Sequence, residues 1–179
     1  MAAHELISAA LPPTLAVVRA VRPDQLDLPS PCGEFTVRDL IEHFRQSTLY
    51  LVSVTGDAPA DPPDGLEERL ALVGEVYAKP ATWEGEVSFP SGPLPAATVG
   101  GMVVTEIVMH GWDLARATGQ SPVWDPQVVE FLESAVGRTA GMGRKMGAYG
   151  PEVPVPADAP PLDRVLGLTG RDPQWTTAA

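Results

Sequence analysis

Helix-length segments with an apolar face dominate this chain, and proline- and glycine-rich segments separate them. Within each segment the apolar residues recur every three or four positions, which is the spacing of one face of an α-helix. Each such face must be buried against another element, so several in succession predict a helix bundle. The predicted helices are 4–21, with a kink or restart at Pro12–Pro13, then 37–54, 65–78, 95–118, 126–146 and a short one over 162–168.

Residues at the helix ends support these boundaries. Thr36 is placed as the N-cap of the second helix, and Asp39, three residues later, can complete a capping box. Gly119 can adopt the left-handed conformation that ends many helices, and Asp125 followed by Pro126 is typical of a helix start. The start and stop signals therefore agree with the apolar periodicity.

The segment between the third and fourth helices differs from the rest. Residue types alternate over 83–95, which predicts one or two short strands within a long crossover. A length of 179 residues suits one domain, so we expect a single all-α helical-bundle domain over 1–179. Its last part, 150–179, begins with a proline-rich stretch and is expected to pack on the bundle as a C-terminal extension.

Composition argues against several classes of function. The net charge of −11 and the lack of a basic stripe argue against nucleic-acid binding, because phosphates would be repelled. No apolar run is long enough to span a membrane, and the first residues lack the basic start of a signal peptide. With a single cysteine and no internal disulfide, we expect a cytoplasmic protein. The excess of arginine over lysine, with many alanines, prolines and glycines, is typical of GC-rich bacterial genomes.

The chemistry concentrates at Glu106 and His110. They are four residues apart in an apolar helix, so their side chains lie about 40° apart around its axis and point the same way. His43 lies in a second amphipathic segment, and one divalent metal ion could bind all three side chains. The alternative is an exposed Glu–His helix pair without a ligand, worth about 0.2–0.5 kcal/mol.

Two motifs in the chain resemble those of a known protein family. The loop-to-helix signature of the DinB-like metalloproteins is similar to Pro31-Cys-Gly-Glu-Phe-Thr-Val-Arg-Asp-Leu-Ile-Glu-His43, and their second signature is similar to Glu106-Ile-Val-Met-His-Gly-Trp-Asp-Leu-Ala-Arg-Ala-Thr-Gly119. Within this superfamily the chain most resembles the N-terminal domain of mycothiol-dependent maleylpyruvate isomerase and its single-domain relatives, whose usual ending is similar to 161–175. The resemblance implies a four-helix bundle with up-down-down-up topology. The metal ligands that it implies are His43, Glu106 and His110.

This ligand set restricts the choice of metal. Two histidines and one glutamate are found in catalytic zinc sites, where a further position stays open for water or substrate. Zinc is therefore the expected ion, although the same ligands also suit iron, nickel or manganese. The remaining histidine, His4, lies in the first turn of a terminal helix and is expected to be solvated.

Residues of the second helix and of the loop before it could surround the metal. Ser47 and Tyr50 lie one and two turns after His43, so they could line the same cavity. Cys32 precedes this helix in a loop that also carries Glu34. Because a reactive thiol needs electropositive surroundings, Cys32 is interpreted as structural.

Polar residues that follow His110 have two interpretations each. Asp113 could orient the His110 imidazole, or it could form an ion pair with Arg116 at the surface. Arg116 could bind a carboxylate of a substrate through two hydrogen bonds, or it could be a solvated ion-pair partner. Trp112 is expected to pack in the core.

The ligand set and the resemblance together suggest a metal-dependent enzyme. The metal would bind a low-molecular-weight thiol and lower its pKa, so that the thiolate attacks an electrophilic substrate. The resemblance implies a transferase or isomerase with mycothiol as co-substrate, in an actinobacterial host. The sequence assigns no catalytic residue beyond the metal ligands.

Other functions stay open. The bundle could bind a metal or a small ligand without turnover, which the lack of the isomerase's C-terminal domain favours. Metal-assisted hydrolysis is a further alternative, but no residue is clearly placed as its base. Bundles of this type often pair, so a homodimer is also an open expectation.

Overall fold

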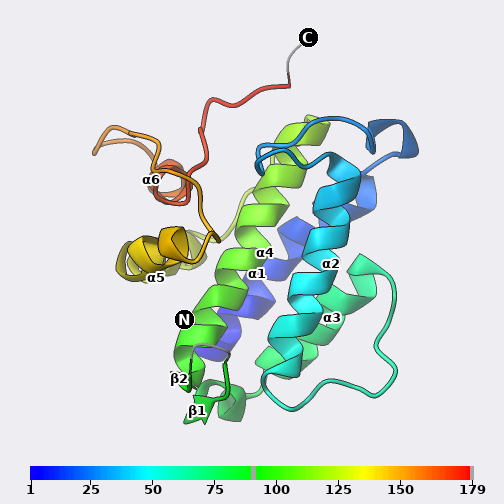
Figure 1. The fold of residues 1–179 in the computed structure, drawn as a ribbon, viewed down its shortest axis with the longest axis vertical. Coiled ribbons are helices and arrows are strands. Elements are labelled where there is room, and N and C mark those ends of the chain that lie inside the picture. Colours follow the sequence, from blue (N-terminus) through cyan, green and yellow to red (C-terminus); the bar gives the residue numbers. More distant parts are fainter. Residues whose placement is uncertain (90–91, 178–179) are drawn as a thin grey trace.

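The computed structural model describes residues 1–89 and 92–177, and most of them are helical (Figure 1). The helices are α1 (Ala3–Ala20), α2 (Val37–Ser53), α3 (Leu66–Tyr77), α4 (Ala96–Thr118), α5 (Pro126–Lys145) and α6 (Pro161–Leu168), with short 3-10 turns at Pro23–Gln25 and Pro80–Trp83. All six predicted helices are confirmed, and each end lies within one residue of its predicted position.

The first four helices form a bundle. α1 packs against α3 and α4, and α2 packs against the same two helices. α1 and α4 run in one direction and α2 and α3 in the other, because the connection between α2 and α3 returns along the length of the bundle (Figure 1). This arrangement places α2 beside α4, although residues 54–95 lie between them in the sequence.

α4 is the central element of the fold. Most of its side chains are buried, because α1, α2 and α5 all pack against it. A helix that is covered on several sides is apolar around most of its circumference, which explains the long apolar run in its sequence. Nevertheless, no helix within 1–89 and 92–177 has both the length and the apolar character needed to cross a membrane. The polar residues of α4 that are buried need partners inside the protein.

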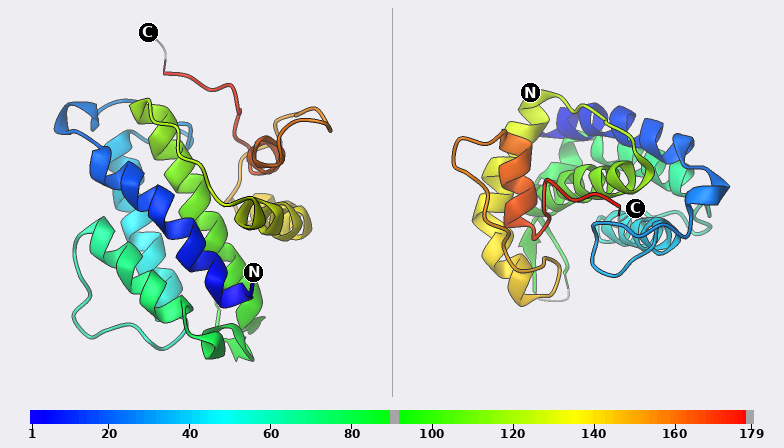
Figure 2. Two further views of the ribbon diagram at one scale, coloured as in Figure 1. Left: turned by 180° about the vertical axis from the view of Figure 1, so that it is seen from behind. Right: turned by 90° about the horizontal axis from the view of Figure 1, so that it is seen from above.

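The C-terminal helices lie beside α4, with their axes steeply inclined to the bundle (Figures 1 and 2). α6 packs on α5, and Val165 and Leu166 are fully buried in the same apolar core as the bundle residues. The described part of the predicted extension therefore contributes to the core of the protein.

α1 continues through Pro12 and Pro13, so of the two predicted alternatives, a kink or a restart, the restart is wrong. Two adjacent prolines remove the N–H groups that would bond to the carbonyls one turn earlier. Contacts with α3 and α4 compensate for this loss: Thr14 is fully buried, and its Oγ1 donates to the Ile107 carbonyl of α4 at 3.1 Å. Tertiary packing here outweighs the local preference of proline.

The helix caps and the crossover agree with the sequence. The Thr36 side chain accepts a hydrogen bond from the Asp39 N–H, and Gly119 ends α4 with a φ of 75°. In the crossover, β1 (Glu86–Val87) pairs antiparallel with β2 (Leu94–Pro95), so the predicted strand segment is confirmed. Two residues of this hairpin, 90–91, lie outside the described residues.

Close packing of α1 on α4 depends on Gly111. A Cβ at this position would lie 2.6 Å from Thr14 Oγ1 and 3.1 Å from a ring carbon of Trp124. We expect Gly111→Ala to lower the free energy of unfolding by about 1–3 kcal/mol, because overpacking outweighs the better helix propensity of alanine. Urea unfolding of the variant measures this loss.

Gly137 provides the matched control. It is an exposed residue within α5, and a Cβ there would have open space around it. Gly137→Ala should therefore raise the free energy of unfolding, by up to about 1 kcal/mol. Equal effects of the two substitutions would contradict the packing described for α1 and α4.

Candidate metal centre

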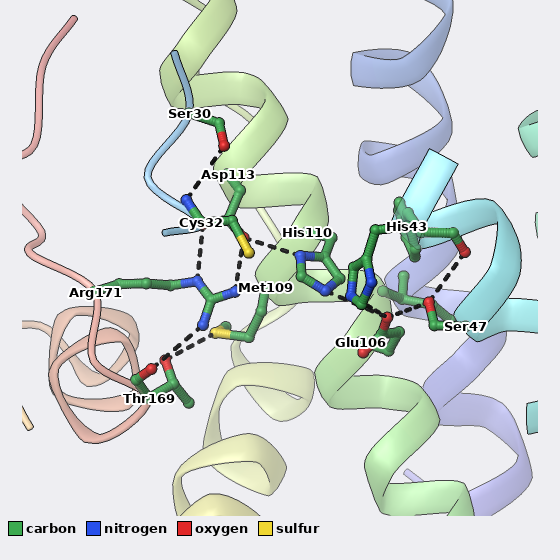
Figure 3. A network of polar contacts seen from close by, with 12 residues as sticks. Ser30, Cys32, His43, Ser47, Glu106, Met109, His110, Asp113, Thr169 and Arg171 are labelled. Carbon is green, nitrogen blue, oxygen red and sulfur yellow. Dashed lines mark hydrogen bonds and ion pairs between the residues drawn. The ribbon is translucent and has the colours of Figure 1, made fainter. Parts of the chain in front are cut away.

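α2 and α4 bring His43, Glu106 and His110 together (Figure 3). His110 Nε2 lies 3.3 Å from Glu106 Oε1, and His43 Nε2 lies 3.9 Å from the same oxygen. The two imidazole rings are nearly perpendicular, at 87°, with their centroids 4.9 Å apart. The four-residue spacing on α4 explains the first contact, whereas the packing of α2 on α4 supplies His43.

The spacing of these atoms suits a small divalent cation. In a tetrahedral zinc site with bonds of about 2.0–2.2 Å, neighbouring ligand atoms are about 3.3–3.6 Å apart. The separation between His110 Nε2 and Glu106 Oε1 lies in this range, and the 3.9 Å between His43 Nε2 and the same oxygen is slightly longer. The three ligand atoms lie within 4.8 Å of one another, so the cluster could hold a metal ion.

The cluster is closed on one side and accessible on the other. The side chain of His110 is 7% exposed, whereas those of Glu106 and His43 are 21% and 42% exposed. Ser47 Oγ donates a hydrogen bond to Glu106 Oε1 and thereby fixes this carboxylate from the α2 side. A small molecule could therefore approach the ligand atoms past His43 and Glu106.

Behind His110 lies a second row of charged groups (Figure 3). His110 Nδ1 lies 3.0 Å from Asp113 Oδ2, and the Arg171 guanidinium donates to both Asp113 oxygens, at 2.8 and 2.7 Å. Asp113 is fully buried, so its predicted alternative, a surface ion pair with Arg116, is wrong. When one imidazole nitrogen is hydrogen-bonded to a carboxylate, the other nitrogen is available to bind a metal. Metal-binding histidines usually have such a carboxylate or carbonyl partner.

Arg116 has a different neighbourhood from the one expected. Its guanidinium lies over the Trp112 ring, 5.7 Å from the centroid, and donates to the carbonyls of Pro173 and Trp175. Trp112 is buried in the core, as predicted. Arg116 therefore holds the C-terminal segment against α4 and does not line the cavity beside the cluster.

The charged groups of the cluster shift one another's pKa. Burial alone would raise the pKa of Glu106, but His110 and the hydrogen bonds from His110 and Ser47 outweigh it and lower that pKa to about 2. For His110, burial is outweighed by Glu106 and Asp113, which raise its pKa. Burial and the nearby His110 lower the pKa of His43. Without a metal, Glu106 and Asp113 thus favour the protonated form of His110, whereas burial and His110 favour the neutral form of His43.

Metal uptake should therefore release about one proton per ion at neutral pH, because His110 must lose its proton to become a ligand. The affinity for zinc should rise with pH until His110 has lost its proton. Because the pKa of His110 is raised, protons compete with zinc for this imidazole up to a higher pH than at an ordinary histidine. Zinc calorimetry in buffers of different ionisation enthalpy measures the released proton. Binding that is independent of both buffer and pH would contradict the role given to His110.

A cavity of about 940 Å³ adjoins the cluster. His43, Ser47, Glu106 and His110 form part of its wall, and Tyr50 also lines it, as predicted for Ser47 and Tyr50. The loop before α2, the end of α5 and the segment after α6 supply the rest of the wall. This volume is at the upper end of the usual range for small-molecule sites, about 300–1,000 Å³.

The sequence did not reveal two of the groups at this site. Arg171 lies 58 residues after Asp113 in a segment interpreted only as a terminal extension, and no local pattern marks it as a buried cation. The neighbouring Glu34 predicts a structural role for Cys32, yet the Cys32 sulfur lies within 4.8 Å of ligand atoms of His110 and Asp113. Because both Asp113 oxygens bind Arg171, this second group suits a cation less well than the first.

Comparison with known proteins gives the relationship of the chain. It is 35% identical over 178 residues to the uncharacterized protein Rv0738 of Mycobacterium tuberculosis (strain ATCC 25618 / H37Rv), a match that covers 94% of this chain and 96% of the relative. The uncharacterized protein MT0763 of strain CDC 1551 / Oshkosh matches to the same extent. The chain belongs to the family of these mycobacterial proteins. No family description and no solved structure matches the chain.

Proposed function

We propose that this protein is a zinc-dependent transferase or isomerase that activates a low-molecular-weight thiol for attack on an electrophilic substrate. The observation that carries the proposal is a set of two imidazoles and one carboxylate at the wall of a large cavity. His43, Glu106 and His110 would hold a zinc ion, and the ion would lower the pKa of a thiol bound at its remaining position.

The protein's own residues would prepare this position. Asp113 fixes the tautomer of His110, and Arg171 balances the charge of Asp113, so that the buried carboxylate needs no proton. Ser47 holds the carboxylate of Glu106 toward the two imidazoles. The exposed edge of His43 leaves room on the cavity side for a thiol and for the electrophile.

The proposal extends to fold type and co-substrate. We propose that the bundle is of the DinB type with up-down-down-up topology, which the directions of α1 to α4 support (Figure 1). Mycothiol is proposed as the thiol, because of the resemblance to mycothiol-dependent maleylpyruvate isomerase. Relatives from Mycobacterium tuberculosis support an actinobacterial host.

Kinetics with a fluorogenic electrophile test this function. The zinc-loaded protein should accelerate the reaction of mycothiol with monochlorobimane, and chelation of the zinc should remove the acceleration. Glu106→Gln keeps the size of the side chain but removes the charge, so it should be inactive at the zinc concentration that saturates the unmodified chain. Zinc binding without any acceleration would reject the enzyme and leave a non-catalytic metal- or ligand-binding module.

A further inference from the structure

The lining of the cavity beside the cluster is rich in methionine and aromatic side chains. Four of the chain's five methionines line this one cavity: Met102, Met109, Met142 and Met146. Met142 and Met146 are 50% and 59% exposed, although methionine is usually buried. Methionine is flexible and polarisable, so a wall of this kind adapts to apolar ligands of different shapes.

Aromatic residues complete the apolar wall. Phe35 and Tyr50 are 37% and 40% exposed and line the same cavity, together with Phe89, Tyr149 and Trp175. Phe35 lies against the candidate ligand His43, with a centroid distance of 5.4 Å. Of the six large apolar side chains that are exposed within the described residues, Phe35, Tyr50, Met142 and Met146 belong to this cavity. The exposed apolar surface of the protein is thus concentrated where a ligand would contact the cluster.

The charges in the cavity cancel one another. Arg171 and the two candidate histidines are its only basic side chains within the described residues, and Arg171 is bound through two hydrogen bonds to Asp113. The two positive charges of a zinc ion would be balanced by Glu106 and by a bound thiolate. The other acidic residues of the lining, Glu34 and Asp172, are exposed and add negative charge at its edge.

From this wall and this charge balance we infer that the electrophilic substrate is an uncharged, apolar molecule, and not a dicarboxylate. That this molecule reacts with a thiol rests on the proposed function. That the cavity prefers uncharged ligands rests on the cavity alone. An anionic group placed there would find no free cation and would lose its hydration. In the reaction, the thiolate sulfur forms a bond to the electrophilic carbon, the leaving group departs with its bonding electrons, and the thiol proton passes to solvent.

A matched pair of fluorescent probes tests the ligand class without turnover. N-phenyl-1-naphthylamine and 8-anilinonaphthalene-1-sulfonate share one aromatic skeleton and differ by the sulfonate. The chelator-treated protein should bind the uncharged probe on the order of tenfold more tightly than the sulfonate. Equal affinities, or a preference for the sulfonate, would overturn the inference.

Met142→Lys places a cation in the apolar wall at a half-exposed position. It should weaken binding of the uncharged probe and strengthen binding of the sulfonate, each by several-fold to about tenfold. Val123→Lys is the control, because Val123 is 83% exposed and does not line the cavity. Identical behaviour of the two variants would show that the probes bind elsewhere and would also overturn the inference.

Turnover separates this inference from the proposed function. With zinc and mycothiol present, 1-chloro-2,4-dinitrobenzene should react with kcat/KM on the order of tenfold above that of 4-chloro-3,5-dinitrobenzoate, which carries a carboxylate. Preference for the carboxylate compound would overturn the inference while supporting the enzyme. If neither compound reacts, the proposed function fails, and the two probes still decide which ligands the cavity accepts.

Discussion

Replacing Arg171 with methionine should lower the free energy of unfolding by about 3–5 kcal/mol, the range found when one partner of a buried ion pair is removed. Methionine retains most of the length of the side chain, but it leaves the Asp113 carboxylate, which is fully buried, with His110 as its remaining charged partner. Urea unfolding monitored by circular dichroism measures the loss. An expected consequence is that the segment after α6 loosens, because this ion pair joins it to α4.

Two further variants show whether burial of the pair causes the effect. Arg38→Met removes an arginine whose side chain is 60% exposed and whose partner, Asp27, is 88% exposed. It should change the free energy of unfolding by less than about 1 kcal/mol. Adding Asp113→Asn to Arg171→Met should recover part of the loss, since no unpaired charge then stays buried. Similar losses for Arg171→Met and Arg38→Met would contradict the buried pair.

His110→Ala should abolish zinc uptake, whereas the unmodified chain should take up about one equivalent. The imidazole is a candidate ligand and also lies next to Asp113, so its removal takes away both a donor and the contact that aligns it. Elemental analysis after dialysis against zinc, with the protein concentration from absorbance, gives the stoichiometry. His4→Ala is the matched control, because it also removes one histidine but lies outside the cavity.

A variant that keeps the packing of α4 shows whether the loss of zinc uptake results from unfolding. Glutamine has nearly the same shape as glutamate but lacks its charge. Loss of a residue that only supports a metal ligand weakens metal binding about 10–100-fold, so Glu106→Gln, which changes a ligand itself, should weaken zinc binding at least as much. Its circular dichroism spectrum should match that of the unmodified chain. Full zinc uptake by both His110→Ala and Glu106→Gln would contradict the assignment of the ligands.

Features that depend on neighbours in the sequence could be predicted. The capping box of Thr36 and Asp39 lies within one turn of backbone, and the juxtaposition of Glu106 and His110 follows from helix geometry alone. His43 could be added because the chain has few histidines and the resemblance includes it. The structure brings these three side chains together, as the sequence analysis expected.

Features that depend on packing between distant segments could not be predicted. Pro12 and Pro13 would interrupt an isolated helix, and only contacts with other helices hold α1 continuous there. Proximity in the sequence predicts Arg116, which is in the same helix, as the partner of Asp113. The actual partner, Arg171, lies 58 residues after Asp113. Similarly, Glu34 is adjacent to Cys32 in sequence, whereas the folded chain places His110 and Asp113 close to its sulfur.

X-ray absorption at the zinc edge decides whether His43, Glu106 and His110 bind one metal ion. The zinc-loaded protein in thiol-free buffer should show two imidazole nitrogens at about 2.0–2.1 Å and a carboxylate oxygen at about 2.0–2.2 Å, with no sulfur in the first shell. Added mycothiol should then introduce one sulfur at about 2.3 Å. A sulfur neighbour before any thiol is added would place the ion at Cys32. A first shell of oxygens without imidazole nitrogen would contradict metal binding by His43, Glu106 and His110.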